Sequence, residues 1–358
     1  MSGAEAVRLR PLVETVVDGE HLWLLRGPAG GDCRIADPSP AVLALVELLD
    51  GRGGTPAELA TALRRGGLAA GEGEVAGMLA SLDAAALLEP VRPEPEDDRY
   101  ARQLLYLRER RPAGADAERM QDRLRAARVA IIGCGGLGSW AAAGLACVGI
   151  GAMTLVDGDV VERSNLNRQL LFRERDVGRA KVVAAAETLR AFDSALALEV
   201  VERQLLDVGA IRDCVRGHDL VIACADKPAY DIARWINAAC LAEGIPHISA
   251  GQLPPTVRVG PLVLPGETGC LACLEAALRE ANPLYDRLEA RRRADRRPHA
   301  TLGPASGIVG QVIATEALHH LTGLVRPATA GSVWTMDLRS LEAERTPVRR
   351  RAGCPACG

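Results

Sequence analysis

The chain has 358 residues, of which 48% are hydrophobic, and this length allows two or three domains with cores of their own. The net charge of -3 gives no overall basic field for nucleic acid. The first residues, MSGAEAVRLRPLVE, contain no apolar signal segment. We therefore expect a cytoplasmic globular protein without a nucleic-acid or membrane partner.

The first ninety residues predict a small α+β domain. Alternating apolar and polar residues over positions 6–25, with Asp18-Gly19 between two runs, predict a β-hairpin. Three helices should follow, one over 40–49, one starting at Pro56 after a Thr55 cap, and one over 72–88. A proline-rich, acidic linker, VRPEPEDD at 91–98, then places a boundary between domains 1–92 and 93–358.

The second domain alternates between helical and strand patterns. Such alternation predicts an α/β fold with a Rossmann-like, mainly parallel sheet that helices cover on both faces. Strands are expected over 129–132, 197–201, 220–223 and 247–250, and helices around 99–104, 117–126, 139–148, 179–190, 229–241 and 303–318.

A glycine-rich stretch joins the first of these strands to a helix. The apolar run Val129–Ile132 is followed by GCGGLG at 133–138, a pattern typical of a turn that brings backbone N–H groups close to phosphate. The uncharged stretch 129–156 could also be a membrane span, but seven of its 28 residues are glycines grouped at a turn and at element junctions. A dinucleotide oxidoreductase would use the same device, with Asp157 at the end of the next strand.

Three further motifs favour ATP over a dinucleotide. They are Asp157-Gly158-Asp159, SNLNRQ at 164–169 and VGRAK at 177–181. With them, roughly residues 99–358 resemble the MoeB/ThiF adenylating family, relatives of ubiquitin-activating enzymes. The resemblance implies ATP-dependent adenylation of a carboxylate with release of pyrophosphate. The expected nucleotide-binding residues are Gly133, Gly135, Gly136, Gly138, Asp157, Asp159 and Gln169.

The resemblance also implies roles for charged residues. Asp157 should hold the ribose hydroxyls, although a turn aspartate would look the same in the sequence. Phosphate contacts are expected from Asn165, Arg168 and Lys181. Asp226, which follows the strand at 220–223, should bind Mg²⁺.

Two more basic residues are compared with the family pattern. Arg102 matches the arginine that reaches the phosphates from the partner subunit, which implies a homodimer; otherwise it is a solvated helix arginine. Lys227 stands where the family usually has asparagine, so its role stays open.

Four of the ten cysteines form two Cys-x-x-Cys pairs. Chance predicts roughly 0.3 such pairs in a chain of this composition. Closing the loop of about 80 residues between them costs about 4 kcal/mol, against ~10–16 kcal/mol from a structural zinc. Four thiolates without an open position predict structural zinc, with two redox pairs as the alternative. The expected ligands are Cys270, Cys273, Cys354 and Cys357.

The segment between the cysteine pairs lacks the nucleophile of ubiquitin-type members. No cysteine occurs from Leu274 to Gly353, so thioester transfer is not expected. Within it, the basic residues 287–302 are poorly patterned and predict a mobile loop over the active site, or else simply a solvated charge run.

The layout and position of the first domain resemble the PqqD-like, winged-helix leader-peptide recognition element. Together the two resemblances, similar to microcin C and pantocin type adenylating enzymes, imply adenylation of a ribosomally made precursor peptide. Residues 1–92 would bind the peptide, and other enzymes of the pathway are possible partners. Alternatives are a first domain that only dimerises or forms a lid, a MoeB-type activator of a sulfur-carrier protein, and a peptide-binding scaffold for a partner cyclising enzyme.

Overall fold

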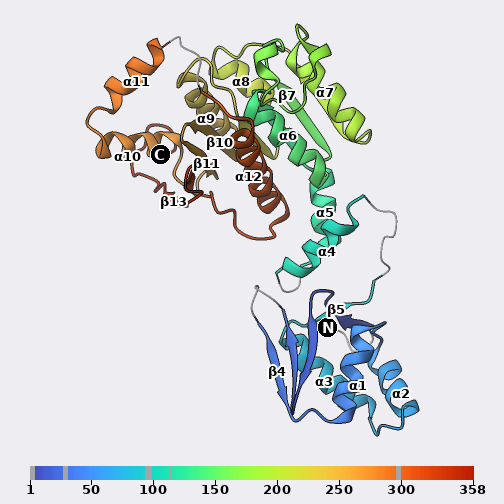
Figure 1. Ribbon diagram of the computed structural model, residues 1–358. Helices are drawn as coiled ribbons and strands as arrows, with labels where there is room; N and C mark the ends of the chain where they lie inside the picture. The colour runs from blue at the N-terminus through green and yellow to red at the C-terminus, as the bar shows by residue number, and fades with distance from the viewer. Residues whose placement is uncertain (1–4, 27–30, 93–98, 113–114, 296–299) are drawn as a thin grey trace. The chain divides into compact units, whose positions relative to one another are not determined.

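The computed structural model describes residues 5–26, 31–92, 99–112, 115–295 and 300–358. The chain divides into two compact units, Met1–Asp116 and Ala117–Gly358 (Figure 1). The first unit includes helix α4 (Ala101–Arg110), where Arg10 Nη1 donates to the carbonyl oxygens of Arg108 and Glu109 at 3.5 and 3.4 Å. Residues 93–98 of the expected linker lie outside the described residues.

The first unit contains the predicted hairpin within a three-stranded sheet of order β2-β3-β4. Strands β2 (Glu14–Asp18) and β3 (His21–Leu25) are antiparallel, and Gly19 has the positive φ of +58° that this short turn requires. β4 (Cys33–Ala36) pairs with β3. The prediction is wrong for residues 7–9: β1 (Val7–Leu9) pairs instead with β5 (Leu88–Pro90).

Three helices cover this unit, as predicted: α1 (Pro40–Asp50), α2 (Pro56–Arg65) and α3 (Glu72–Ala84). Thr55 and Glu58 cap α2 reciprocally, each side chain accepting a backbone N–H. α3 ends at Ala84 rather than at Leu88, because Leu87 and Leu88 turn into the core and Leu88 starts β5. The small α+β fold is therefore present.

The second unit is built on an eight-stranded sheet of order β13-β12-β11-β10-β9-β6-β7-β8. Its parallel part confirms the predicted Rossmann-like sheet. An antiparallel extension, which the sequence analysis did not identify, continues it from β10. The strands are β6 (Arg128–Ile132), β7 (Ala152–Val156), β8 (Ala197–Val201), β9 (Leu220–Ala223), β10 (His247–Leu253), β11 (Thr256–Val263), β12 (Ser332–Asp337) and β13 (Ala343–Pro347).

Helices cover both faces of this sheet (Figure 1). α8 and α9 pack on one face through a core shared with β6 and β9. On the other face α6 and α12 pack closely, because a Cβ at Gly144 would lie only 2.7 Å from Ala314 Cβ. The helices are α5 (Ala117–Ala126), α6 (Gly136–Val148), α7 (Lys181–Phe192), α8 (Val208–Val215), α9 (Asp231–Glu243), α10 (Leu271–Ala281), α11 (Tyr285–Ala294) and α12 (Gly303–Thr322).

The uncharged stretch 129–156 is a strand, a helix and a strand of this fold. It contains β6, α6 and β7, and α6 has 13 residues. Across the described parts of the chain, no helix combines the length and the apolar character needed to cross a membrane.

The first half of the segment predicted as a loop over 287–302 is helical, which corrects that prediction for residues 287–294. Helix α11 extends to Ala294, and residues 296–299 lie outside the described residues. Ion pairs hold this helix: Glu289 accepts from both Arg234 and Arg293, with shortest distances of 2.6 and 2.9 Å. Charged residues that were read as a solvated run therefore include partners of α9.

Candidate nucleotide site and metal centre

The turn after β6 has no room for side chains. Gly133 has φ of +95°, and an added Cβ would lie 2.5 Å from the backbone nitrogen of Ala225. A Cβ at Gly138 would overlap the carbonyl oxygen of Gly133. The predicted sequence of strand, tight turn and helix is therefore confirmed, and only glycine fits these two positions.

The N-terminus of α6 follows directly after this turn. Its N-cap, Gly135, provides no side-chain cap, so the first-turn N–H groups and the positive end of the helix dipole can accept an anion. A Cβ at Gly136 would lie 3.6 Å from Arg168 Cδ, and one at Gly135 would lie 3.9 Å from Gln169 Nε2. The structure thus brings the glycines together with Arg168 and Gln169 in a cradle that suits a phosphate chain.

Replacement of Gly133 by alanine is expected to weaken ATP binding at least tenfold and to destabilise the second unit. The added methyl group must displace the backbone at Ala225 and adopt a left-handed conformation, which together exceed about 1–2 kcal/mol. Calorimetric titration with ATP and thermal unfolding measure both effects. Gly217→Ala is the matched control, because Gly217 has φ of +77° but no atom within 4 Å of its added Cβ. Equal behaviour of the two variants would contradict the steric argument.

Two aspartates link β7 to α7. Asp157 accepts backbone N–H groups of Cys134 at 2.7 Å and Asp159 at 2.9 Å. Asp159 accepts Lys181 Nζ at 2.9 Å and Gln204 Nε2 at 2.9 Å. The structure therefore joins Asp157, Asp159 and Lys181, which the sequence had placed in one site, and adds Gln204.

The electrostatics of this cluster distinguish the two carboxylates. Burial raises the pKa of Asp157, although the positive charge of Lys181 and the two backbone donors oppose the shift. Desolvation is the largest single effect on Asp159 and acts to raise its pKa, but the hydrogen bond and charge of Lys181, with the hydrogen bond from Gln204 and the charge of Lys227, together lower it. Lys181 itself is only 7% exposed, so its ammonium group acts where water screens it little.

The SNLNRQ segment folds back on itself beside the glycine turn. Buried Asn165 accepts the backbone N–H of Glu162 through Oδ1 at 3.0 Å. Arg168 Nη1 donates to the carbonyl oxygen of Ser164 at 2.7 Å, and Trp140 Nε1 donates to the Arg168 carbonyl oxygen at 3.0 Å. The Arg168 backbone is thus held by α6, and its Nη1 is held by Ser164, whereas its guanidinium group has further N–H donors that could contact a phosphate.

The remaining predicted charged residues are exposed. Asp226 and Lys227 follow β9, immediately after Ala225, the residue that abuts Gly133. Arg102 is exposed on α4, in the first unit. Sequence reasoning missed Gln204, because it follows a strand without any motif around it.

The two cysteine pairs form one cluster in the second unit, in which Cys357 is partly buried and the other three are buried. Sγ–Sγ distances are 3.9 Å for Cys270–Cys273, 3.8 Å for Cys270–Cys354 and 3.6 Å for Cys273–Cys357, and all four sulfurs lie within 4.8 Å of one another. Zn–S bonds of about 2.3 Å in a tetrahedron give sulfur separations of about 3.8 Å. The predicted four-residue cluster is therefore present, and it could hold zinc.

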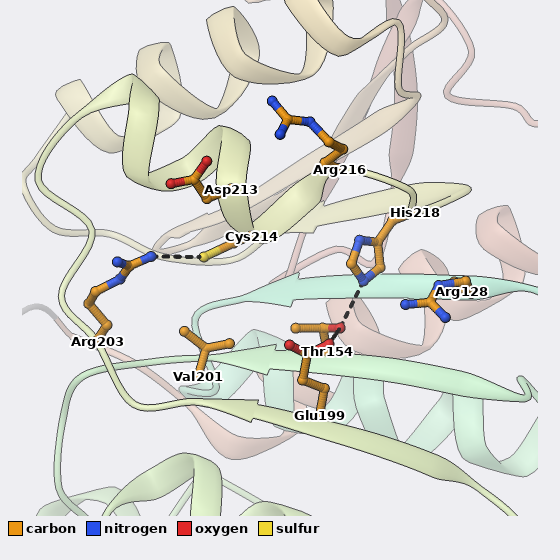
Figure 2. A pocket seen from close by; sticks show the side chains of 9 residues that line it. All are labelled: Arg128, Thr154, Glu199, Val201, Arg203, Asp213, Cys214, Arg216 and His218. Carbon is orange, nitrogen blue, oxygen red and sulfur yellow. Dashed lines mark hydrogen bonds between the residues drawn. The ribbon is translucent and has the colours of Figure 1, made fainter.

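A separate cavity of about 340 Å³ lies between β7, β8 and α8 (Figure 2). Within it, Thr154 Oγ1 is 2.8 Å from His218 Nε2 and donates to Glu199 at 3.3 Å. His218 Nδ1 is 3.0 Å from the carbonyl oxygen of Val215, so both ring nitrogens already have partners. None of the site residues predicted from the sequence lines this cavity.

The parallel sheet with a glycine turn and an uncapped helix N-terminus defines a nucleotide-binding protein of the Rossmann-like class. The sequence matches the ThiF family over residues 100–356, and the chain belongs to this family. It is 34% identical over 238 residues to the sulfur carrier protein ThiS adenylyltransferase of Escherichia coli K12. The aligned residues cover 66% of this chain and 88% of that protein. The molybdopterin-synthase adenylyltransferase of the same strain is 32% identical over 238 residues, 66% of this chain and 90% of that protein.

The fold is also similar to that of E. coli MccB in a crystal structure with AMPCPP and MccA. The TM-score is 0.80 at 23% identity, and the match covers 99% of each chain. The family match and the two adenylyltransferase relatives make the chain a ThiF-family adenylyltransferase, for which ATP use is implied. The predicted family and enzyme class are therefore confirmed.

Proposed function

We propose that this adenylyltransferase activates the C-terminal carboxylate of a ribosomally made precursor peptide. The observation that carries the proposal is the first unit, Met1–Asp116, which is present in addition to the adenylation unit. The likeness to MccB covers 99% of both chains, whereas the matches to the two carrier-protein adenylyltransferases cover 66% of this chain. One related structure contains MccB, described as a microcin C7 biosynthetic enzyme, with N-formylated MccA.

The first unit has a surface that suits an extended peptide. β2 is an edge strand of its sheet, pairing with β3 alone among the described strands. Val16 and Val17 on this strand are 44% and 60% exposed. An edge strand offers unpaired backbone groups, and exposed apolar side chains beside them add contacts to a peptide strand. Binding there would raise the effective concentration of a weakly bound carboxylate at the adenylation site.

In the proposed reaction a carboxylate oxygen of the peptide attacks the α-phosphorus of ATP. The new O–P bond forms as the bond to the β-phosphate oxygen breaks, and pyrophosphate leaves with the electron pair. We assign the triphosphate to the α6 N-terminus with Asn165, Arg168 and Lys181, since negative charge shifts onto pyrophosphate as the bond breaks. Asp157 would hold the ribose, and Asp226 would bind Mg²⁺ against the phosphates.

The proposal includes a homodimer in which Arg102 of one copy supplements the phosphate contacts of the other. Its exposure on α4 is compatible with such a contact.

Four thiolates leave a zinc ion no open position, so the metal would hold the second unit together and take no part in the chemistry.

Activation of a sulfur-carrier protein is the second candidate, because the names of the relatives favour it. ATP–pyrophosphate exchange with the full chain decides between the two. We expect exchange with the precursor peptide encoded beside this chain, and little with a carrier protein ending in Gly-Gly. Exchange with the carrier alone would establish the second candidate. Peptide binding without exchange by either would instead indicate a scaffold for a partner cyclising enzyme.

A further inference from the structure

Arg258, on β11, lies over the backbone of Gly251 in the antiparallel extension of the sheet. Its Cα pairs with Gly251 on β10, and a Cβ at Gly251 would lie 3.1 Å from Arg258 Nε and 3.6 Å from Nη2. Gly251 comes two residues after Ser249, which pairs with Ala223 at the end of β9. Arg258, on β11, therefore lies beyond the end of β9, at the same edge of the sheet as Asp226, which follows β9.

The surroundings of Arg258 provide aromatic rings but no anion. Tyr285 and Tyr230 are the groups that interact with its charge. Among the described residues, Arg258 has neither a carboxylate partner nor a hydrogen bond. Arg258 is exposed, and desolvation by the neighbouring protein atoms lowers the pKa of its guanidinium group.

Three neighbouring arginines, one each on α9, α10 and α11, already have carboxylate partners. Arg234 donates to Glu275 and Glu289, and Arg293 donates through both Nη atoms to Asp231 at 2.6 and 2.8 Å. Arg279 donates to Asp286 at 2.9 Å. The carboxylates of this cluster are thus already engaged by other cations. The two rings are occupied as well, with Arg293 5.3 Å from the Tyr230 centroid and Arg279 5.0 Å from that of Tyr285.

Tyr230 has a strained backbone conformation, and such conformations are concentrated at ligand-binding sites. Tyr230 has φ of +66°, which is costly for an aromatic residue, and it immediately precedes α9. Asp231, the next residue, is fixed by Arg293. The strained residue and the unpaired guanidinium group therefore lie together at the edge of the sheet where open α/β proteins bind ligands.

We infer that Arg258 binds the terminal carboxylate of the acyl substrate and directs it toward ATP. The inference rests on the proposed adenylation of a carboxylate. A guanidinium fork matches the two oxygens of a carboxylate, and its charge offsets the repulsion between that carboxylate and the triphosphate. The phosphates have their own donors in Lys181, Arg168 and the α6 N-terminus. Arg258 is thus assigned to the other anion of the reaction, the carboxylate of the acyl substrate.

The test compares a peptide acid with the same peptide as a C-terminal amide, in the presence of a non-hydrolysable ATP analogue. Charge-assisted hydrogen bonds contribute about 1.5–3 kcal/mol, so we expect the wild-type protein to bind the acid at least about tenfold more tightly than the amide. In Arg258→Gln the two forms should bind equally, with unchanged affinity for the ATP analogue. Arg345→Gln, on exposed β13, is the matched control and should keep the wild-type preference for the acid.

Two results would overturn the inference. One is an acid preference that survives in Arg258→Gln. The other is a loss of affinity for the ATP analogue with the acid preference intact, which would assign Arg258 to a phosphate. If the peptide supports no exchange, the acid and amide forms of the Gly-Gly carrier protein give the same comparison, and only the peptide assignment falls. A protein that exchanges with neither partner would overturn both proposals.

Discussion

Replacement of Lys181 by methionine is expected to lower ATP–pyrophosphate exchange by about 10²–10³-fold. Lys181 is buried and donates to Asp159 at 2.9 Å, so its charge acts on the site with little screening. Loss of one preorganised donor to a developing anion costs about 2.7–4 kcal/mol in comparable sites. Methionine is chosen because it keeps an unbranched apolar side chain without the charge. The measurement is the exchange rate at a saturating concentration of the carboxylate partner.

The control for this variant lies on the same helix. Arg190→Ala removes an exposed side chain near the other end of α7, which donates to the carbonyl oxygen of Leu198. It should change exchange by less than about twofold.

Asp226→Ala should lower exchange as the Lys181 variant does, and both variants should keep the affinity of the full chain for the peptide. Lost peptide binding in these two variants would contradict the division of work between the units.

Replacement of Cys354 by serine is expected to remove bound zinc and to unfold part or all of the second unit. A structural zinc contributes about 10–16 kcal/mol in small domains, which is comparable with the whole stability of a typical domain, about 5–15 kcal/mol. Cys354 belongs to the cluster in which all sulfurs lie within 4.8 Å, so its loss leaves three ligands. Metal analysis of the purified protein and differential scanning calorimetry measure the two effects.

Cys147→Ser provides the control for the zinc prediction, because Cys147 is an exposed free thiol on α6. It should keep both the zinc content and the unfolding temperature. Cys354→His should restore part of the metal, since three cysteines and one histidine form a common structural zinc set. Wild-type protein that contains no zinc, or a serine variant as stable as the wild type, would contradict a structural metal.

Elements with a local signal were predictable from the sequence. β8, β9 and α5 have the expected bounds, because apolar periodicity and flanking breakers determine them locally. The Thr55 cap likewise identified the start of α2. The four cysteines were found from spacing alone, since a shared metal explains two pairs far apart in the sequence better than chance does.

Elements that depend on distant partners were not predictable. α11 has four arginines and little apolar periodicity, and it is held by Glu289 and Arg293 through pairs with α9. β11 is interrupted by Gly260-Pro261, so its pattern breaks although it pairs on both sides. Arg258 and Gln204 share this difficulty: Arg258 is positioned by a strand pairing, and Gln204 by a hydrogen bond to Asp159, 45 residues away in the sequence.

The separation of the cysteine pairs also has a consequence for the order of events during synthesis. Cys270 and Cys354 are 84 residues apart, and Cys354 follows the end of the first unit by 238 residues (354 − 116). At about 5–20 residues per second, the ribosome reaches Cys354 on the order of ten to fifty seconds after it completes the first unit. The first unit can therefore fold well before the second can close its cysteine cluster, so a metal held by this cluster would be taken up late in the maturation of the enzyme.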